Sequence, residues 1–555
     1  MSHTSTMGSI ARASTTRRGA RWFAPLRDLP RRWPLTTVLL CSAALRLAVA
    51  ASTPFGTDEA YAVAVATPLQ LSYFDHPPAV FWLAAAMEAL TGTRDPLWIR
   101  LPFVLLFTGT TALVARLGDL LFGRPVGWWS AVVISVTGVI GVTGGSWVLP
   151  DGPLFFAMAL GSWAAAQAIF VHVATPQTAV RWWVLLGIAG AIGALSKYHA
   201  IFLPLGVALF ILGSRSHRHL LATAGPWLAT ALAAAGTLPV LLWNAQHDWM
   251  SLRFQGARAT PSDDWSIAPF AENVAGQFGY LLPWVAPVIG WALWRVLRSV
   301  PDQRHRFVLS IGLGPVLLFT LSTLLGRRGL PHWQAPGYLL LAVLVGEQLA
   351  SRATRAKWPT RWALSASVIT ATVTILLAMV IRTGWLIDRL PRDPATEALS
   401  WDEVAGVVQA LRLQDGASAV SYVATDHWMQ GAKLGAALGH DVPVLVLSDD
   451  ARHFAIAAPP ARWQGRDGLF MRLAPSTAAP LDSLQRARFR TVTRLPDVII
   501  TRSGRPALRV ECYRVRGLDA TPAHSLVIDD LPVVDQQLLA GADVPKRLEV
   551  LAVLE

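Results

Sequence analysis

The residues best suited to chemistry stand in the loop between the first two long apolar segments, residues 53–97. It carries the sequence TDEAY at residues 57–61. Adjacent carboxylates such as Asp58 and Glu59 are expensive at the edge of a membrane core unless they serve a function. A carboxylate there could act as a general base or hold a metal ion. The structural alternative is that Asp58 caps a surface helix that begins at Glu59.

The same stretch continues with YFDHPP at residues 73–78. Asp75 and His76 are polar groups that could contact a substrate, and His76 could also bind a metal ion. The structural alternative makes Asp75 the N-cap of a helix over 78–90, whose first turn tolerates proline. A lone histidine more often satisfies a local hydrogen bond than a metal ion.

Two further charged residues are expected on the same side of the membrane. Asp151 follows Pro150 at one junction between apolar segments, and Lys197 follows Ser196 at another. A lysine held among apolar helices can bind a phosphate. The alternatives are a helix cap for Asp151 and an interfacial side chain reaching toward water for Lys197.

Two outer loops add candidate substrate contacts. The first, WNAQHDW at residues 243–249, precedes Arg253 and Arg258, whose planar guanidinium groups could bind phosphate oxygens through two parallel hydrogen bonds. An ordinary amphipathic interface helix explains this region equally well. The second loop, HWQAP, begins at His332 and pairs an aromatic ring with an amide, which suits a sugar.

The composition indicates what must position these residues. Hydrophobic residues make up 53% of the 555 residues and charged residues 15%. Soluble proteins carry roughly 25% charged residues, so lipid must cover much of this surface. The net charge of +13 is explained by arginines in short loops that orient membrane helices, and not by a nucleic-acid surface. Cys41 and Cys512 are too far apart in the chain to suggest a disulfide framework or a metal site.

About eleven apolar segments are long enough to suggest membrane spans. They are 34–52, 98–122, 126–147, 151–173, 181–196, 199–213, 219–243, 277–298, 306–325, 333–350 and 362–386. The first also resembles a signal peptide, but Arg46 within it and the spans that follow favour a retained helix. The halves of 181–213 are short for two full crossings.

The loop charges predict the orientation. Arginine and lysine are biased roughly three to one toward the loops on the side of the N-terminus, which the positive-inside rule places in the cytoplasm. The predicted organisation is a disordered basic tail at 1–33, a membrane domain at 34–386 and a soluble α/β domain at 387–555. With an odd number of spans, that last domain lies outside. The protein is expected in the plasma (inner) membrane.

The soluble domain shows alternating helix and strand patterns. Helices are predicted at 400–412 and 426–438, and buried strands at 417–424 and 442–447. A strand-rich stretch follows at 489–516, with a turn at residues 503–506. The chain has no phosphate-binding loop, no Asp-x-Asp in a predicted cytoplasmic segment and no Gly-x-Gly-x-x-Gly after a strand. These absences disfavour an ATP-driven pump, a cytoplasmic nucleotide-sugar enzyme and a dinucleotide site.

The sequence resembles bacterial GT-C membrane glycosyltransferases of the protein-mannosyltransferase and aminoarabinose-transferase type (glycosyltransferase family 39-like). The residues that carry the resemblance are the motifs at 57–61 and 73–78, followed in the family's order by PDGPL at 150–154, LSKY at 195–198 and the two outer-loop motifs. The resemblance covers roughly residues 35–475, including the first part of the soluble domain with Trp401 and DDARHF at 449–454. The chain departs from many relatives at Ala62, where a second aromatic residue is common.

The resemblance implies a helix bundle with an extracytoplasmic cavity under the soluble domain. It also implies transfer of a sugar, with inversion, from a polyprenyl-phosphate donor to a lipid, polysaccharide or protein acceptor. Asp58 would then activate the acceptor nucleophile, with Glu59 and Asp151 as further candidate catalytic residues. Lys197, with Arg253 or Arg258, would bind the donor phosphate.

Four residues are candidate substrate contacts: Tyr61, Asp75, His76 and His332. No cofactor is certain; a divalent metal ion is possible, because carboxylates can hold an ion or act alone. The sequence leaves two other functions open. A transporter or flippase of lipid-linked sugars would use the same charged cavity without chemistry, and a structural protein would bind cell-wall glycan through its outer domain. The sugar and the acceptor stay undetermined.

Overall fold

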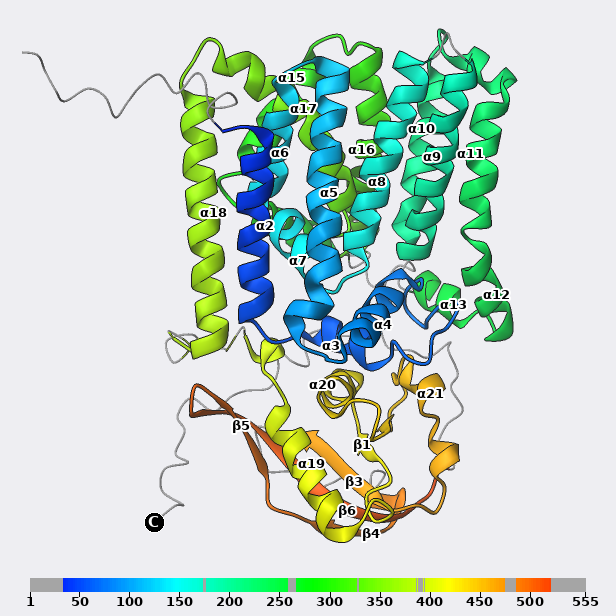
Figure 1. Cartoon of the computed structure of the whole chain (residues 1–555), viewed down its shortest axis with the longest axis vertical. Coiled ribbons are helices and arrows are strands. Elements are labelled where there is room, and N and C mark those ends of the chain that lie inside the picture. Colours follow the sequence, from blue (N-terminus) through cyan, green and yellow to red (C-terminus); the bar gives the residue numbers. More distant parts are fainter. Residues whose placement is uncertain are drawn as a thin grey trace, which may run out of the picture.

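The computed structural model shows a tall helix bundle with a soluble domain packed against one end (Figure 1). It describes residues 33–172, 176–257, 266–326, 329–385, 387, 393, 395–474 and 486–520. The tail predicted at 1–33 lies outside the described residues except for Trp33, and so does the end of the chain after residue 520.

The bundle consists of long apolar helices, because in lipid a helix satisfies every backbone hydrogen bond within its own segment. Its α- and π-helices are α2 (Leu35–Ser52), α5 (Pro96–Phe122), α6 (Val126–Val136), η2 (Gly138–Thr143), α7 (Gly144–Ser146), α8 (Asp151–Ala166), η3 (Gln167–Val171), α9 (Pro176–Ser196), α10 (Phe202–Gly213), α11 (Ala224–Ala235), α12 (Leu238–Gln246), α14 (Ala268–Leu281), α15 (Ala286–Arg298), α16 (Gln303–Ser322), α17 (Ala335–Ala353) and α18 (Trp358–Thr383). Short 3₁₀ turns connect some of them: η4 (Tyr198–Ile201), η5 (Arg218–Ala222) and η6 (Thr323–Leu325).

The predicted spans all coincide with helices, but eleven full crossings are not confirmed. Among the described residues, seven helices are long and apolar enough to cross a membrane, or up to nine if each bent pair counts as one span. The remaining predicted segments correspond to the short helix over Tyr198–Gly213 and to α17. The protein is therefore a multi-pass membrane protein with fewer clear spans than its hydropathy suggested.

Bends explain part of this difference. The helix pair over Val126–Ser146 bends by 93°, and the pair α14 and α15 bends by 106° at Leu282. Arg46 of α2 donates from Nε to the carbonyl of Gly141 at 2.6 Å and so ties the first of these bends to the bundle. A segment that turns back in this way can place its end inside the bundle and not at the opposite surface.

The centre of the bundle is closely packed around α17. Leu339, Leu341 and Val343 of this helix are fully buried. A Cβ atom at Gly337 would lie 2.4 Å from the carbonyl oxygen of Gly312 in α16. Only a residue without a side chain allows the two backbones to approach so closely, which is typical of membrane helix interfaces.

A layer of short helices separates the bundle from the soluble domain (Figure 1). These helices are α3 (Thr57–Ala64), α4 (Ala79–Thr91) and α13 (Met250–Ala257). The first two belong to the stretch 53–97, which returns to the bundle through α5. Asp95 caps α5 by accepting a hydrogen bond from the Leu97 amide at 2.9 Å, and Pro96 occupies the first helical position.

The soluble domain has the predicted α/β character. After η8 (Thr396–Ala398) its elements are α19 (Asp402–Asp415), β1 (Val423–Thr425), α20 (Trp428–Leu438), β2 (Val444–Val446), α21 (Phe454–Ala457), η9 (Pro460–Trp463), β3 (Gly468–Leu473), β4 (Phe489–Arg494), β5 (Val498–Arg502) and β6 (Arg505–Leu518). The strand order is β2-β1-β3-β6-β4, with β5 also paired to β6. β1 runs parallel to β2 and β3, and β6 runs antiparallel to its neighbours.

Most of this domain's predicted elements are present, but the strand predicted at 417–424 overlaps β1 (Val423–Thr425) only at residues 423 and 424. The predicted turn joins β5 to β6 through Ser503 and Gly504, which both have positive φ, as a tight hairpin requires. β3 was not predicted from the sequence, although its residues are almost all buried. Its side chains lie in the middle of the sheet, so the strand lacks the alternation of polar and apolar residues that marks an exposed strand.

Candidate functional site

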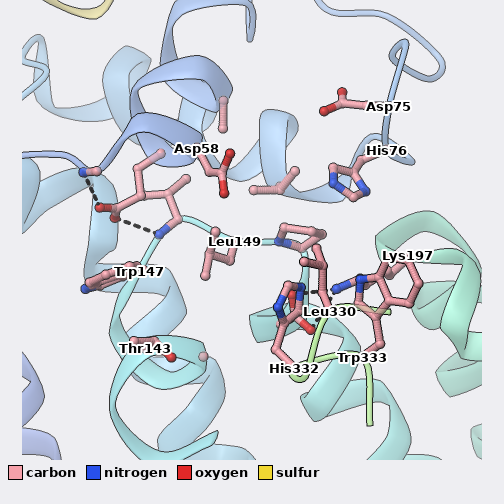
Figure 2. A pocket seen from close by; sticks show the side chains of 18 of the residues that line it. Asp58, Asp75, His76, Thr143, Trp147, Leu149, Lys197, Leu330, His332 and Trp333 are labelled. Carbon is pink, nitrogen blue, oxygen red and sulfur yellow. Dashed lines mark hydrogen bonds and ion pairs between the residues drawn. The ribbon is translucent and has the colours of Figure 1, made fainter. Parts of the chain in front are cut away.

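A cavity of about 1160 Å³ lies where the bundle, the layer of short helices and the soluble domain meet. Eight of the ten predicted site residues line it, and Figure 2 shows several of them around the same space. They are Asp58, Glu59, Tyr61, Asp75, His76, Asp151, Lys197 and His332. The predicted common pocket for Asp58 and Lys197 is therefore present.

Asp58 presents an accessible carboxylate to this cavity. It lies in the first turn of α3, whose N-cap is Gly56, so the alternative role of Asp58 as a helix cap is not observed. The positive end of the helix dipole favours a carboxylate at this position. Glu397 of η8 lines the cavity nearby, where partial burial and the charge of Asp58 raise the pKa of the Glu397 carboxyl. The Asp58 and Glu397 carboxyl groups thus lie close enough in this part of the cavity to influence each other.

Glu59, the neighbour of Asp58, is fully engaged by protein groups. Its oxygens accept hydrogen bonds from Arg100 Nε at 2.7 Å and Nη2 at 2.6 Å. They also accept from the backbone amides of Gly56 and Val148, both at 2.9 Å. Both charged side chains are 1% exposed. This arrangement holds α3 against α5 and leaves Asp58 as the carboxylate of the pair that is open to the cavity.

Asp151 and Lys197 form a buried ion pair on the membrane side of the cavity. Lys197 Nζ donates to Asp151 Oδ1 at 2.9 Å and to Oδ2 at 2.8 Å. Asp151 begins α8 without capping it, and Lys197 ends up 5% exposed, so neither structural alternative describes these residues. Two of the three ammonium donors contact Asp151, which leaves one for another acceptor.

Asp75 belongs to a network that crosses from the stretch 53–97 to the soluble domain. Its Oδ1 accepts from the Tyr61 hydroxyl at 3.1 Å, and its Oδ2 lies 3.7 Å from Arg452 Nη1. Gln255 Nε2 donates to its backbone carbonyl at 2.6 Å. Asp75 does not cap α4, whose N-cap is Pro78. Burial and the nearby Asp75 carboxylate raise the pKa of Tyr61 well above its usual value, so its hydroxyl stays protonated.

The loop that carries His332 is anchored by buried amides. Gln334 Nε2 donates to Asn273 Oδ1 at 2.9 Å, and Asn273 Nδ2 donates to the carbonyl of Gly329 at 2.8 Å. Figure 2 shows His332 and Trp333 on the same side of the cavity as Lys197. Aromatic rings of this kind offer a surface on which a sugar can pack.

The two predicted arginines do not join the cavity in the described part of the chain. Arg253 is exposed on α13 and does not line it, so the predicted phosphate contact has no geometric support there. Arg258 lies outside the described residues. Among the residues that are described, no group of three or more His, Cys, Asp or Glu side chains could hold a metal ion.

The soluble domain contributes lining residues that the sequence analysis assigned no role. They include Glu397, Trp428, Met429 and Arg452. Arg452 lies within the DDARHF motif, so the resemblance contained a signal for it. Glu397 is an ordinary glutamate in a polar segment and carries no comparable signal in the sequence.

The sequence of this chain is similar to sequences of known sugar transferases. The family described as dolichyl-phosphate-mannose-protein mannosyltransferase matches residues 75–243. The lipid A galacturonosyltransferase RgtD of Rhizobium johnstonii is 28% identical over 319 residues, a match that covers 57% of this chain and 64% of that relative. The chain therefore matches less than two thirds of RgtD.

Two crystal structures of ArnT from Cupriavidus metallidurans share the architecture. The structure bound to undecaprenyl phosphate has a TM-score of 0.59 at 15% identity, and the apo structure has 0.60 at 12%. Both comparisons cover 86% of this chain and 97% of the ArnT chain. They confirm the predicted fold class, a membrane helix bundle with a soluble α/β domain.

Proposed function

We infer that this chain is a GT-C membrane glycosyltransferase of the protein-mannosyltransferase and aminoarabinose-transferase type. We propose that it moves a sugar from a polyprenyl-phosphate carrier to an acceptor in the cell envelope, with inversion at the anomeric carbon. The observation that carries this proposal is one cavity with the accessible Asp58 carboxylate on α3 and the buried Lys197–Asp151 pair at its membrane side.

Asp58 is the proposed general base. A hydroxyl oxygen of the acceptor attacks the anomeric carbon, and its proton passes to an Asp58 carboxylate oxygen. The bond between the anomeric carbon and the carrier's phosphate oxygen breaks, and the phosphate leaves with the bonding electrons. Attack opposite the departing phosphate inverts the anomeric centre. Glu59 supports this chemistry by holding α3, since its oxygens are already occupied by Arg100 and two backbone amides.

Lys197 is the proposed contact for the departing phosphate. Its remaining ammonium donor can bind a phosphate oxygen, while Asp151 holds the ammonium in place. Charge that develops on the phosphate during bond breaking is stabilised most by a donor that is already positioned. Trp333 and His332 are proposed to contact the sugar, because they line the cavity close to Lys197.

The apolar part of the cavity wall suits the carrier's lipid chain. Ile201 and Leu318 line the cavity and are 60% and 55% exposed. Ile201 ends η4, which directly follows Lys197, and Leu318 lies next to Phe319 in α16. Exposed apolar side chains of a membrane domain are solvated by lipid, so a polyprenyl chain can reach the cavity here without crossing water.

The names of the relatives favour transfer over the transport alternative. RgtD is named a lipid A galacturonosyltransferase, and one ArnT structure holds undecaprenyl phosphate. We propose the same class of donor and an envelope acceptor for this chain. We further propose that it lies in the plasma membrane with its soluble domain outside, as the loop charges indicate.

The test is sugar transfer by the purified protein in lipid nanodiscs, with a panel of undecaprenyl-phosphate-linked sugars as donors. Asp58→Asn should still bind donor but lose transfer. Lys197→Met should weaken donor binding and slow transfer, whereas Lys357→Met, at an exposed lysine after α17, should change neither. Transfer by Asp58→Asn at the normal rate would refute the assignment of this residue.

Mass spectrometry of envelope lipids and glycans from a strain that lacks the protein would then identify the acceptor. The expected result is the loss of one sugar from one envelope component. An unchanged set of glycans, with the acceptor-bearing structures present, would count against the proposed reaction.

A further inference from the structure

Arg452 brings a cation from the soluble domain into the cavity. It lies between β2 and α21 and has a φ of 49°, a conformation that side chains other than glycine adopt at a cost. Its side chain is 12% exposed. This unfavourable backbone conformation occurs where the Arg452 guanidinium lines the cavity.

The guanidinium stacks on aromatic rings. Its central carbon lies 3.5 Å from the centroid of the Trp428 ring and 5.8 Å from that of Phe254. Its contacts with Asp75 Oδ2 and Asp450 Oδ1 are both 3.7 Å long, beyond hydrogen-bonding distance. The buried Nε atom has no hydrogen-bond partner among the described residues.

Arg100 provides a comparison within the same protein. Its guanidinium donates to both oxygens of Glu59 and to backbone carbonyls, with nitrogen–oxygen distances of 2.6 to 3.0 Å. An arginine with a purely structural role is expected to be satisfied in this way, because an unpaired buried donor costs about 1–3 kcal/mol. Arg452 is stacked on Trp428, which leaves its planar edge of N–H donors suited to an oxyanion.

We propose that Arg452 binds a carboxylate or phosphate group carried by the transferred sugar or by the acceptor. This inference rests on the proposed function. Arg452 comes from the soluble domain, whereas Lys197, the residue proposed for the carrier phosphate, comes from the membrane helices, and both line the same cavity. In the absence of substrate the Asp75 carboxylate occupies the anion position, 3.7 Å from the Arg452 guanidinium. The bound ligand replaces this contact by direct hydrogen bonds to the guanidinium.

The proposal predicts opposite effects for two substitutions. Arg452→Gln removes the charge, and it should raise the KM for the anionic substrate about ten- to hundred-fold, the effect of losing a charge-assisted pair. Asp75→Asn removes the competing charge but keeps an oxygen for the Tyr61 hydroxyl, so it should lower that KM. Disruption of the fold would not improve binding. Arg462→Gln, at an exposed arginine of the same domain, is the matched control.

The source of the anion is resolved with paired probes and the full-length protein in nanodiscs. One pair is an undecaprenyl-phosphate-linked hexuronic acid and the corresponding hexose, which differ by the carboxylate. The other is a phosphorylated glycolipid acceptor before and after phosphatase treatment. An effect of Arg452→Gln confined to the acidic member of the first pair places the anion on the sugar, and one confined to the second pair places it on the acceptor.

Three results would overturn the proposal: equal effects on the acidic and neutral members of both pairs, no effect on either pair, or weaker binding of undecaprenyl phosphate alone. Binding is also measured by tryptophan fluorescence, because Trp428 contacts the guanidinium. Loss of transfer with every donor, together with intact discrimination in this binding assay, would reject the proposed function and keep the anion site.

Discussion

Replacement of Glu59 by glutamine distinguishes a supporting role of this carboxylate from a chemical one. Glutamine keeps one acceptor oxygen and replaces the other by an NH₂ group, which would face an N–H donor of Arg100 and the backbone N–H of either Gly56 or Val148. Arg100 would then be a charged side chain, 1% exposed, without its anionic partner. Breaking a buried ion pair on one side costs about 3–5 kcal/mol. We expect the substitution to lower the stability of the protein by this order.

The measurement is thermal unfolding of the purified protein in nanodiscs, followed by tryptophan fluorescence. Glu59→Gln should unfold at a clearly lower temperature than the wild type, and Asp58→Asn at nearly the same temperature. The double substitution Glu59→Gln with Arg100→Met should recover part of the loss, because no charge is left unpaired. If Glu59→Gln unfolds like the wild type yet transfers no sugar, the carboxylate acts in the reaction and our reasoning is wrong.

Three other predictions concern stability and topology. Burial lowers the pKa of Lys433 from its usual 10.5 to about 7, so between these values the unfolded chain binds one proton more than the folded one. The free energy of unfolding should therefore rise with pH in this window, and Lys433→Met should remove that rise in unfolding measured across it. Gly337→Ala should lower the free energy of unfolding by about 1–3 kcal/mol, and with it the unfolding temperature, because the added Cβ would lie 2.4 Å from the Gly312 carbonyl oxygen. Arg462→Cys should react with a membrane-impermeant maleimide in cells whose outer barrier is permeabilised, and protection from the reagent would contradict an external soluble domain.

The short sequence motifs predicted which charged residues line the cavity better than they predicted which elements enclose it. Residues with unusual chemistry for a membrane segment, such as Asp58, Asp151 and Lys197, stand out against apolar neighbours, and the structure gathers them around one space. Their roles stay predictions. The pairing of Glu59 with Arg100 was not foreseen, because hydropathy treats Arg100 as a charge at a helix end and contains no information on its partner.

The bent helices and the soluble wall of the cavity could not be predicted from local patterns. Hydropathy averages over a window, so it joins Val126–Ser146 into one span although the chain turns by 93°. The glycines near the end of this segment, including Gly141 and Gly144, were the sequence feature that indicated a bend. Glu397 and Arg452 reach the cavity only because the soluble domain packs against α3, a tertiary contact without a sequence period.

Lys433 of α20 connects two loops that are far apart in the chain. Its Nζ donates to the carbonyls of Phe55 at 2.5 Å and Leu399 at 3.1 Å. The first loop leads into α3 and the second follows η8, so the Lys433 side chain ties together the two backbone segments that carry Asp58 and Glu397. Any movement that admitted a bulky acceptor between these carboxylates would first have to break the hydrogen bonds of Lys433. A large acceptor should therefore approach along another rim of the cavity, and this corner should stay shut throughout turnover.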